Sequence, residues 1–292
     1  MIVVKILGGL GNQLFQYAFG KAIENKTGNK VYYDVKDLKT NYKLRKFSIA
    51  YFNVKIDTGN ECDMEALKSS FNKIVFKIYQ LSGGRMIPKR KLKYYSQTRF
   101  LFDETVFSLS DNVYLNGYWQ SERYFNDIKE LIKSEFTLLD TLNADKLIIS
   151  KQIDNSNSVS IHIRRGDYIN VPANKKLYHS CSLQYYEDAI NYISARLANP
   201  LFFIFSDDIS WAKDNLNGNY NLVFMNPGNE DYEDLTLMSR CKHNIIANST
   251  FSWWAAWLNS ADDKMVIAPK QWFVNNSRST VDLLPQNWIT LQ

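Results

Sequence analysis

The chain has 292 residues, 45% of them apolar, and carries a net charge of +5. This composition supports one large or two medium hydrophobic cores, excludes a disordered or fibrous protein, and gives no basis for a nucleic-acid partner. Its three cysteines, Cys62, Cys181 and Cys241, are widely spaced and form no CxxC pair, which argues against a disulfide framework or a structural zinc site and favours a reducing cytoplasm.

The first forty residues predict a strand, a turn, a helix and a second strand. Residues 2–7 form a short apolar run, and the glycines of residues 8–11 then turn the chain. Residues 12–26 carry apolar side chains at helical spacing, Gly28 ends this helix, and residues 30–34 form the next strand. Such a βαβ unit favours a parallel sheet. The opening run is too short for a signal peptide, so we expect a cytoplasmic protein.

The region from residue 36 to residue 102 carries a weaker pattern. We expect a helix over 61–79, loops at 82–84 and Pro88, a strand over 113–118 and a helix over 122–136.

Residues 71–102 contain no Asp or Glu, and their basic residues alternate with aromatic ones. This stretch predicts either peripheral contact with the inner face of the plasma membrane or with a phosphate-bearing acceptor, or a basic face that is simply solvated.

The polar residues 154–158 are the best candidate for a linker near the middle of the chain. Strands and helices alternate beyond it, which predicts a second Rossmann-like unit. We therefore expect an α/β protein with two domains, 1–153 and 154–292, facing a central cleft. The expected strands are 159–164, 201–206, 222–226, 244–247 and 265–269, and the expected helices are 183–197, 209–215, 230–240 and 252–259.

Residues 159–168 place polar side chains at the end of a buried strand. Alternation along a strand puts His162 and Arg164 on the face opposite the apolar residues. A buried Arg needs a partner, and a phosphate bound at the carboxyl end of the strand would provide one. The alternative is an internal ion pair from Arg164 or Arg165 to Asp167 or another carboxylate. We discount the Arg-Gly-Asp triplet as an adhesion motif, because it directly follows a buried strand rather than lying in an exposed loop.

The segment Ser206-Asp207-Asp208 follows the next buried strand, at the same side of the sheet. Its carboxylates could accept hydrogen bonds from a purine such as guanine, hold a divalent metal, or cap the helix that follows.

Residues 247–254 lead from a strand through a hydroxyl-rich turn into a helix. Backbone N–H groups and hydroxyls at a helix start bind anions, so Ser249–Ser252 could face a nucleotide diphosphate while also capping the helix. The neighbouring tryptophans are expected to pack in the core.

The glycine-rich turn at residues 8–11 matches a dinucleotide fingerprint only loosely, because it lacks the last glycine. It could equally let Asn12 and Gln13 approach a substrate. With only three histidines in the chain, a histidine-rich metal site is not expected.

Together these motifs resemble glycosyltransferase family eleven, the α-1,2-fucosyltransferases. The resemblance rests on residues 9–18, 162–168, 205–208 and 248–254 and covers most of the chain. The block at 162–168 is shared with α-1,6- and protein O-fucosyltransferases, whereas the first and last blocks narrow the linkage to α-1,2. Residues 36–102 match no motif and are expected to select the acceptor.

The resemblance implies a GT-B fold and an inverting, metal-independent transfer of fucose from GDP-fucose to a galactose-containing glycan, which could be lipid-linked. The C-terminal domain would bind the donor, and the N-terminal domain would present the acceptor through Gly11, Asn12 and Gln13. Arg164 would contact the β-phosphate, and Asp167 is one candidate for the catalytic base; a carboxylate of the N-terminal domain is another. The other donor-binding residues would be His162, Arg165, Ser206, Asp207, Asp208, Asn248, Ser249, Thr250, Phe251 and Ser252.

Other interpretations are a fucosyltransferase of another linkage and a non-catalytic module that binds a nucleotide or glycan. A third is an oxidoreductase that uses the glycine-rich turn for NAD. Incubation with GDP-fucose and a galactoside separates these classes, because only a fucosyltransferase would transfer the sugar and release GDP.

Overall fold

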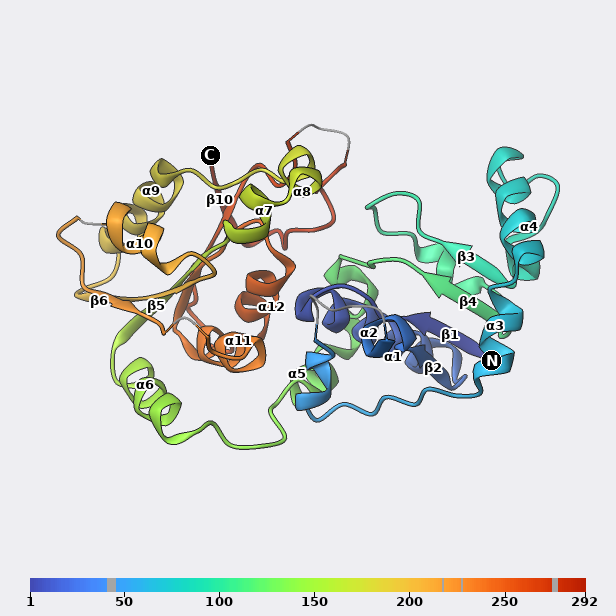
Figure 1. The fold of residues 1–292 in the computed structure, drawn as a ribbon, viewed down its shortest axis with the longest axis horizontal. Coiled ribbons are helices and arrows are strands. Elements are labelled where there is room, and N and C mark those ends of the chain that lie inside the picture. Colours follow the sequence, from blue (N-terminus) through green and yellow to red (C-terminus); the bar gives the residue numbers. More distant parts are fainter. Residues whose placement is uncertain (41–45, 217, 227, 275–277) are drawn as a thin grey trace. The chain divides into compact units, whose positions relative to one another are not determined.

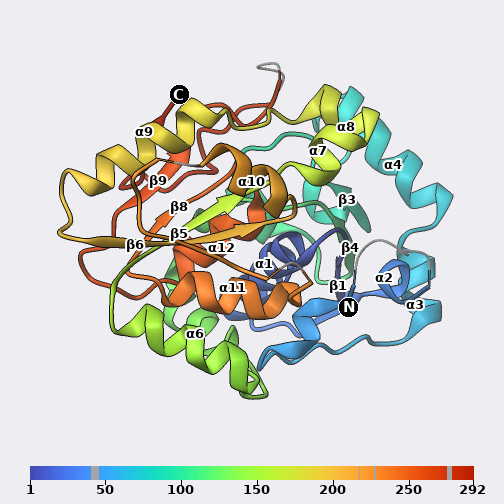
Figure 2. The same ribbon diagram turned by 60° about the vertical axis from the view of Figure 1, so that its left-hand side comes forward.

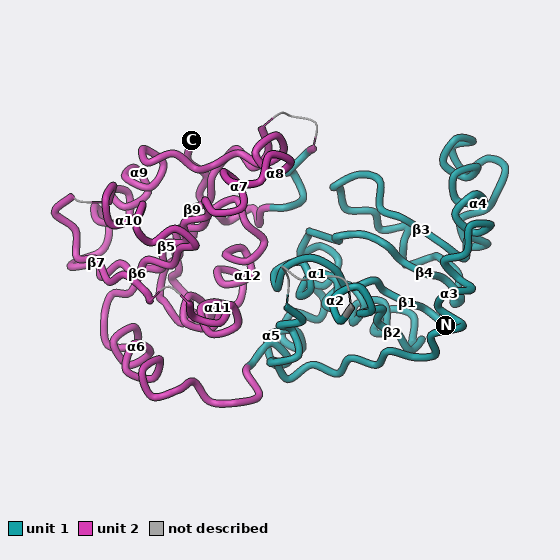
Figure 3. Tube along the Cα trace, viewed as in Figure 1, with its two compact units in different colours: residues 1–137, 279–283 teal, residues 138–278, 284–292 magenta. Residues whose placement is uncertain are grey.

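The chain divides into two compact units, each built on a parallel sheet (Figure 3). Unit 1 comprises Met1–Thr137 and Ser279–Leu283, and unit 2 comprises Leu138–Arg278 and Leu284–Gln292. The computed structural model describes residues 1–40, 46–216, 218–226, 228–274 and 278–292.

Unit 1 contains, in its described part, a four-stranded sheet of order β2-β1-β4-β3 in which all neighbours are parallel (Figure 1). The predicted strands at 2–7, 30–34 and 113–118 are confirmed, while β3 was not expected. The strands are β1 (Ile2–Lys5), β2 (Val31–Asp34), β3 (Tyr94–Ser96) and β4 (Val113–Asn116).

Helix α1 (Leu10–Thr27) confirms the helix that the apolar spacing predicted over 12–26, and most of its residues are buried. It ends at Gly28, whose φ of 70° is a conformation that glycine adopts without a steric penalty. Phe19 of α1 stacks on Trp119, with 4.0 Å between the ring centroids. Both side chains are buried, so this aromatic contact anchors the helix.

Two predicted helices of unit 1 are interrupted. The helix expected over 61–79 is two helices, because the Ser69 hydroxyl accepts a hydrogen bond from the Asn72 N–H and starts a new helix there. The helix expected over 122–136 begins with two 3₁₀ turns. The helices are α2 (Lys36–Thr40), α3 (Glu61–Leu67), α4 (Ser70–Leu81) and α5 (Lys129–Glu135), and the 3₁₀ turns are Ser48–Tyr51, Lys89–Lys91, Glu104–Ser108, Glu122–Tyr124 and Asn126–Ile128. Residues 41–45 of the proposed acceptor-selecting region lie outside the described residues.

Unit 2 contains, among its described residues, a six-stranded parallel sheet of order β10-β9-β8-β5-β6-β7. The five predicted strands are confirmed, and β10 adds an unexpected edge strand. The strands are β5 (Asn157–Ile163), β6 (Pro200–Ser206), β7 (Leu222–Phe224), β8 (His243–Ile245), β9 (Val266–Pro269) and β10 (Ile289–Leu291).

Helices cover both faces of this sheet (Figure 2). Helix α9 packs on the face that carries the apolar side chains of β5, and α12 lies against the opposite face. The helices of unit 2 are α6 (Ala144–Asp154), α7 (Gly166–Asn170), α8 (Pro172–Leu177), α9 (Leu183–Ser194), α10 (Ile209–Asn215), α11 (Asp231–Arg240) and α12 (Thr250–Leu258). None of the described helices is both long and apolar enough to cross a membrane.

The predicted linker at 154–158 was wrong. Asp154 ends α6 and pairs with Arg240, while Asn157 and Ser158 already belong to β5. The Ser158 hydroxyl accepts a hydrogen bond from the Lys242 N–H, so this polar side chain is part of the sheet rather than of a linker. The division into units accordingly falls at 137/138 instead of 153/154.

A short C-terminal segment, Ser279–Leu283, returns to unit 1. Asp282 holds it there: one carboxylate oxygen lies 2.7 Å from an Arg123 guanidinium nitrogen, and the other accepts a hydrogen bond from the Phe102 N–H at 3.0 Å. The two-domain prediction therefore stands in outline, but its boundaries do not.

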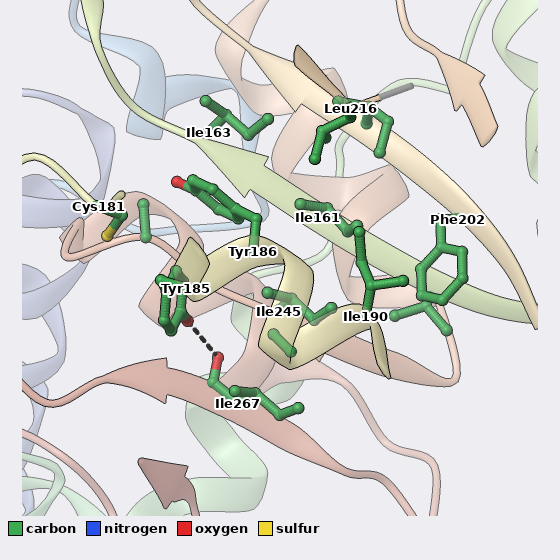
Figure 4. Packing of buried hydrophobic residues seen from close by; sticks show 14 of the residues in the cluster. Ile161, Ile163, Cys181, Tyr185, Tyr186, Ile190, Phe202, Leu216, Ile245 and Ile267 are labelled. Carbon is green, nitrogen blue, oxygen red and sulfur yellow. Dashed lines mark hydrogen bonds between the residues drawn. The ribbon is translucent and has the colours of Figure 1, made fainter. Parts of the chain in front are cut away.

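The core of unit 2 lies between β5 and α9 (Figure 4). Val159, Ile161 and Ile163 share the α9 face of β5, as alternation along the strand predicted. The buried Tyr185 hydroxyl donates to the backbone oxygens of Ile246 at 2.7 Å and Ile267 at 3.2 Å. One side chain thereby ties α9 to the two chain segments that continue β8 and form β9.

Tyr185→Phe should lower the free energy of unfolding by about 1–2 kcal/mol, because it removes a buried donor and leaves the two carbonyl oxygens without it. Urea unfolding followed by circular dichroism measures this. Tyr220→Phe is the matched control, since the Tyr220 hydroxyl makes an exposed hydrogen bond to Asn191, and its effect should stay within about 0.5 kcal/mol. Equal stability of the two variants would show that the Tyr185 hydroxyl has no special role.

Candidate active site

The carboxyl ends of β5, β6 and β8 bring the three sequence motifs of unit 2 together. β6 follows β5 on one side in the sheet, whereas β8 lies on the other side. The chain order therefore reverses at β5, and open α/β sheets bind ligands at such a switch point, outside the carboxyl ends of the strands. The segments that leave these three ends are Arg164–Asp167, Ser206–Asp208 and Ile246–Ser249.

Arg164 lies at the centre of this edge and bridges two carboxylates. One guanidinium nitrogen is 2.8 Å from an Asp167 oxygen, and another is 3.1 Å from an Asp207 oxygen. This is the internal pairing that the sequence left open as the alternative to phosphate binding. The Arg164 side chain keeps about a quarter of its surface exposed (23%).

Arg165 is held by a second set of contacts. Its backbone N–H donates to the Asp207 carboxylate at 2.8 Å, and its Nε lies 3.6 Å from an Asp208 oxygen. The guanidinium also lies over the Trp211 ring, 4.0 Å from the centroid, which is a cation–π contact. Asp207 thus connects both arginines, through a side chain in one case and the backbone in the other.

Ser206 and Asp208 organise the turn from β6 into α10. The Ser206 hydroxyl accepts a hydrogen bond from the Asp208 N–H, and the Asp208 carboxylate accepts one from the Trp211 N–H at 3.2 Å. Asp208 is therefore the N-cap of α10, one of the roles that the sequence allowed. Its remaining oxygen is the one near Arg165.

His162 is buried on the α12 face of β5, where its ring lies 5.4 Å from the Phe251 ring. Within the described part of the chain, no group hydrogen-bonds its Nδ1. Burial, with a smaller contribution from the Arg164 charge, lowers the pKa of His162 to about 3. The imidazole is therefore neutral at physiological pH.

Helix α12 starts at this same edge of the sheet. Ser249 is its N-cap and accepts a hydrogen bond from the Phe251 N–H. The helix is nine residues long. The backbone N–H groups of its first turn have no partner within the helix, and they give a partial positive charge beside the neutral His162 ring. Thr250 and Phe251 are partly exposed there, as expected of groups that could meet a ligand.

Two predicted donor-binding side chains are used internally instead. The Asn248 amide donates to the backbone oxygens of His179 and Trp272, and its oxygen accepts from the Cys181 thiol. The Ser252 hydroxyl donates to the backbone oxygens of Ala247 and Ser249. Both side chains are 1% exposed, so the prediction that they bind the donor is corrected: they shape the turn from β8 to α12.

The N-terminal motif needs a similar correction. Gln13 is fully buried; its amide nitrogen donates to the backbone oxygens of Gly8 and Lys46, and its amide oxygen accepts from the Ile49 N–H. Gly11 is buried within α1. Gln13 therefore fixes the glycine turn rather than meeting a substrate. Asn12 is partly exposed and accepts a hydrogen bond from Gln120, so its acceptor-side role stays a prediction.

Three contributors to the site were not expected from the sequence. A Cβ added to Gly166 would lie 2.8 Å from an Asp207 oxygen, so this glycine makes room for the carboxylate that pairs with Arg164. The Trp211 ring packs against the Arg165 guanidinium, and the Tyr168 ring lies 5.8 Å from the Arg164 guanidinium. Gly166 and Tyr168 belong to the motif at 162–168, whereas nothing in the sequence pointed to Trp211.

The site combines groups that suit an anionic ligand with three carboxylates that pair with its two arginines. Two guanidinium groups and a helix N-terminus converge at one sheet edge, beside a neutral imidazole. The described residues contain no group of three or more His, Cys, Asp or Glu side chains placed to hold a metal ion.

Solved structures share this fold. Arabidopsis thaliana FUT1 in complex with GDP matches 91% of the chain, and 70% of its own, with a TM-score of 0.55 and 11% identity. The fucosyltransferase NodZ from Bradyrhizobium matches 87% of the chain, and 91% of its own, with a TM-score of 0.52 and 16% identity. At such low identity the likeness establishes the fold alone. Two units, each built on a parallel α/β sheet, are the architecture of the GT-B fold class.

The chain belongs to glycosyl transferase family 11, whose family description matches residues 1–292. An alpha-1,2-colitosyltransferase from Escherichia coli is 35% identical, over 100% of this chain and 99% of that protein. The O-antigen biosynthesis glycosyltransferase WbnK from Escherichia coli is 32% identical, over 97% and 98%. Galactoside alpha-(1,2)-fucosyltransferase 1 from Lagothrix lagotricha is 30% identical over 51% of this chain and 43% of its own. The family resemblance seen in the sequence is thus confirmed.

The low pKa of His162 makes stability depend on pH. The unfolded chain binds a proton here below its ordinary pKa of about 6.5, whereas the folded chain stays neutral down to about 3. The folded state therefore becomes less stable as the pH falls through this window. His162 alone should lower the free energy of unfolding by about 2 kcal/mol between pH 7 and pH 5.

Urea unfolding of the wild type and of His162→Asn at both pH values measures this difference. The variant should lose about 2 kcal/mol less than the wild type on acidification. His179→Asn is the control, because His179 is a partly exposed histidine of the same unit. An identical acid response in the wild type and His162→Asn would show that His162 titrates normally.

Proposed function

We propose that this enzyme transfers L-fucose from GDP-β-L-fucose to the 2-hydroxyl of a galactoside in a glycan, with inversion at the sugar carbon. The observation that carries the proposal is the convergence of Arg164, Arg165 and the start of α12 at the switch point of unit 2, in a chain of family 11. Unit 2 would bind the nucleotide, and unit 1 would present the acceptor.

The relatives support this choice of donor and linkage. Two names among them specify an alpha-1,2 linkage, and structural neighbours were solved with GDP or soaked with GDP-fucose. The full-length colitosyltransferase relative favours a second candidate donor, a nucleotide-activated colitose, on the same site.

In the proposed reaction the acceptor hydroxyl attacks the anomeric carbon on the face opposite the leaving diphosphate. The bond from this carbon to the β-phosphate oxygen breaks, and negative charge builds on the departing GDP. Arg164 and the first-turn N–H groups of α12 would stabilise this charge in a fixed geometry, the role that a metal ion fulfils in other enzymes. The reaction would then need no metal cofactor.

The carboxylates around Arg164 give this mechanism a specific requirement. Asp167 and Asp207 pair with the guanidinium, and a diphosphate bound there would take over part of this pairing. Asp167 released from Arg164 would be one candidate for the base that takes the acceptor proton; a carboxylate of unit 1 is the other.

Arg164→Ala should lower kcat about 10²–10³-fold, equivalent to about 2.7–4 kcal/mol, because it removes a fixed donor to the leaving group. Steady-state release of GDP measures the change. Arg240→Ala is the matched control: this arginine of unit 2 forms an exposed pair with Asp154 and should leave kcat unchanged. Full activity in a folded Arg164→Ala protein would remove Arg164 from the mechanism.

The donor and the absence of a metal requirement are tested together by incubating the enzyme with GDP-fucose and lactose, with and without EDTA. We expect GDP release and an α-1,2-linked product at the same rate in both, because the proposed charge stabilisation comes from the chain itself. The linkage is read by nuclear magnetic resonance, and activated colitose is assayed in parallel.

Each alternative has its own outcome in this assay. A product with another linkage would contradict the α-1,2 assignment, and loss of activity in EDTA would contradict metal independence. Transfer of colitose but not of fucose would show that activated colitose, rather than GDP-fucose, is the donor. Tight nucleotide binding without turnover over a panel of galactosides would indicate a binding module.

A further inference from the structure

Helix α4 (Ser70–Leu81) of unit 1 leaves one apolar face in solvent. Four large side chains, which we call the α4 stripe, are exposed by 72%, 57%, 39% and 80%; they are Phe71, Ile74, Ile78 and Leu81. Their spacing of three or four residues places them along a single side of the helix. Met86, 74% exposed, extends the apolar surface just past the helix end.

The opposite side of α4 already anchors the helix to unit 1. Phe76 is buried and makes edge contacts with the rings of Tyr94 and Tyr95, at 5.9 and 5.3 Å. Figure 1 shows α4 beside β3 at the edge of the unit 1 sheet. The α4 stripe is therefore not needed for the core of unit 1. A contiguous exposed apolar face of this kind marks an interaction surface.

The surroundings of the α4 stripe are strongly basic. Residues 71–102 contain no acidic residue. Lys77 lies one helical turn before Leu81 of the stripe, whereas Lys73 is exposed but its Nζ lies 5.9 Å from the centroid of the Tyr94 ring. Lys89 is paired with Asp103, so it contributes less free charge than the rest. The exposed basic residues of this segment are Lys73, Lys77, Arg85, Arg90, Lys91, Lys93 and Arg99.

We propose that the α4 stripe and its basic border dock unit 1 on the surface of a membrane rich in anionic lipid. An amphipathic helix that lies in the interface sinks its apolar face about 5–10 Å toward the acyl chains. The lysines and arginines beside it meet the negative headgroups. Twelve residues give a contact about 18 Å long, and Met86 lengthens it.

Charge complementarity selects the membrane over a second copy of the chain. Two copies joined through their α4 stripes would bring the basic borders together, and like charges in an interface oppose association. A solvated basic face would account for the lysines and arginines but not for the uncovered Phe71 and Leu81.

The test is flotation of the full-length protein with two kinds of vesicle, phosphatidylcholine alone and equal parts of phosphatidylcholine and phosphatidylglycerol. We expect the protein to float with the mixed vesicles only, and to be released by added salt. Two double variants separate the contributions: Phe71→Ser with Leu81→Ser removes apolar anchors, and Lys73→Glu with Lys77→Glu reverses charge. Each should weaken vesicle partition about tenfold or more.

The matched control is Leu147→Ser with Ile148→Ser on α6, where the same kind of change is made to two exposed apolar side chains (44% and 66%) of another helix. This control should float like the wild type. All substituted side chains are exposed, and circular dichroism checks that each variant is folded. The affinity for GDP, whose binding the proposed function assigns to unit 2, should be unchanged in every variant, which separates this proposal from the proposed reaction.

Three results would overturn the proposal. These are equal flotation with both kinds of vesicle, unchanged flotation of the two α4 variants, and a dimer in solution that the Phe71→Ser/Leu81→Ser variant dissolves while no form binds vesicles. The last result would assign the α4 stripe to self-association.

Discussion

The site depends on the pairing of Arg164 with Asp167 and Asp207. This guanidinium joins the end of β5 to the end of β6 and to the first turn of α7. Asp207 then reaches the Arg165 backbone, and Gly166 leaves the space that this carboxylate needs. Each of these groups is thus held by a partner at the same sheet edge of unit 2, and groups held in place are what electrostatic stabilisation requires.

This sheet edge holds one more carboxylate than guanidinium groups. The two arginines lie against three carboxylates, those of Asp167, Asp207 and Asp208. Each partly buried guanidinium therefore has an acidic partner. An anionic ligand must compete with these carboxylates for the arginines. The neutral His162 ring and the start of α12 add no competing negative charge. We therefore expect that the binding of an anionic ligand is accompanied by a rearrangement of these ion pairs.

Periodicity and turn residues were enough to predict the elements that carry the site. The apolar alternation of β5 placed Arg164 at a sheet edge, and the hydroxyl-rich turn placed the start of α12. What could not be predicted is which polar groups face outward: Asn248, Ser252 and Gln13 all have side chains that suit ligands, but burial assigns them to backbone carbonyls. The mistaken linker at 154–158 has the same origin, since polar residues can end a helix and begin a strand as well as connect domains.

The return of Ser279–Leu283 to unit 1 affects how the protein can be divided. The backbone passes between the units at 137/138, again at 278/279 and once more at 283/284. A gene fragment that stops after residue 137 would omit Asp282 and leave Arg123 and the Phe102 N–H without their carboxylate. For the same reason, a protease cut at 137/138 would not free unit 1 as an independent piece, because its last segment is supplied from the far end of the chain.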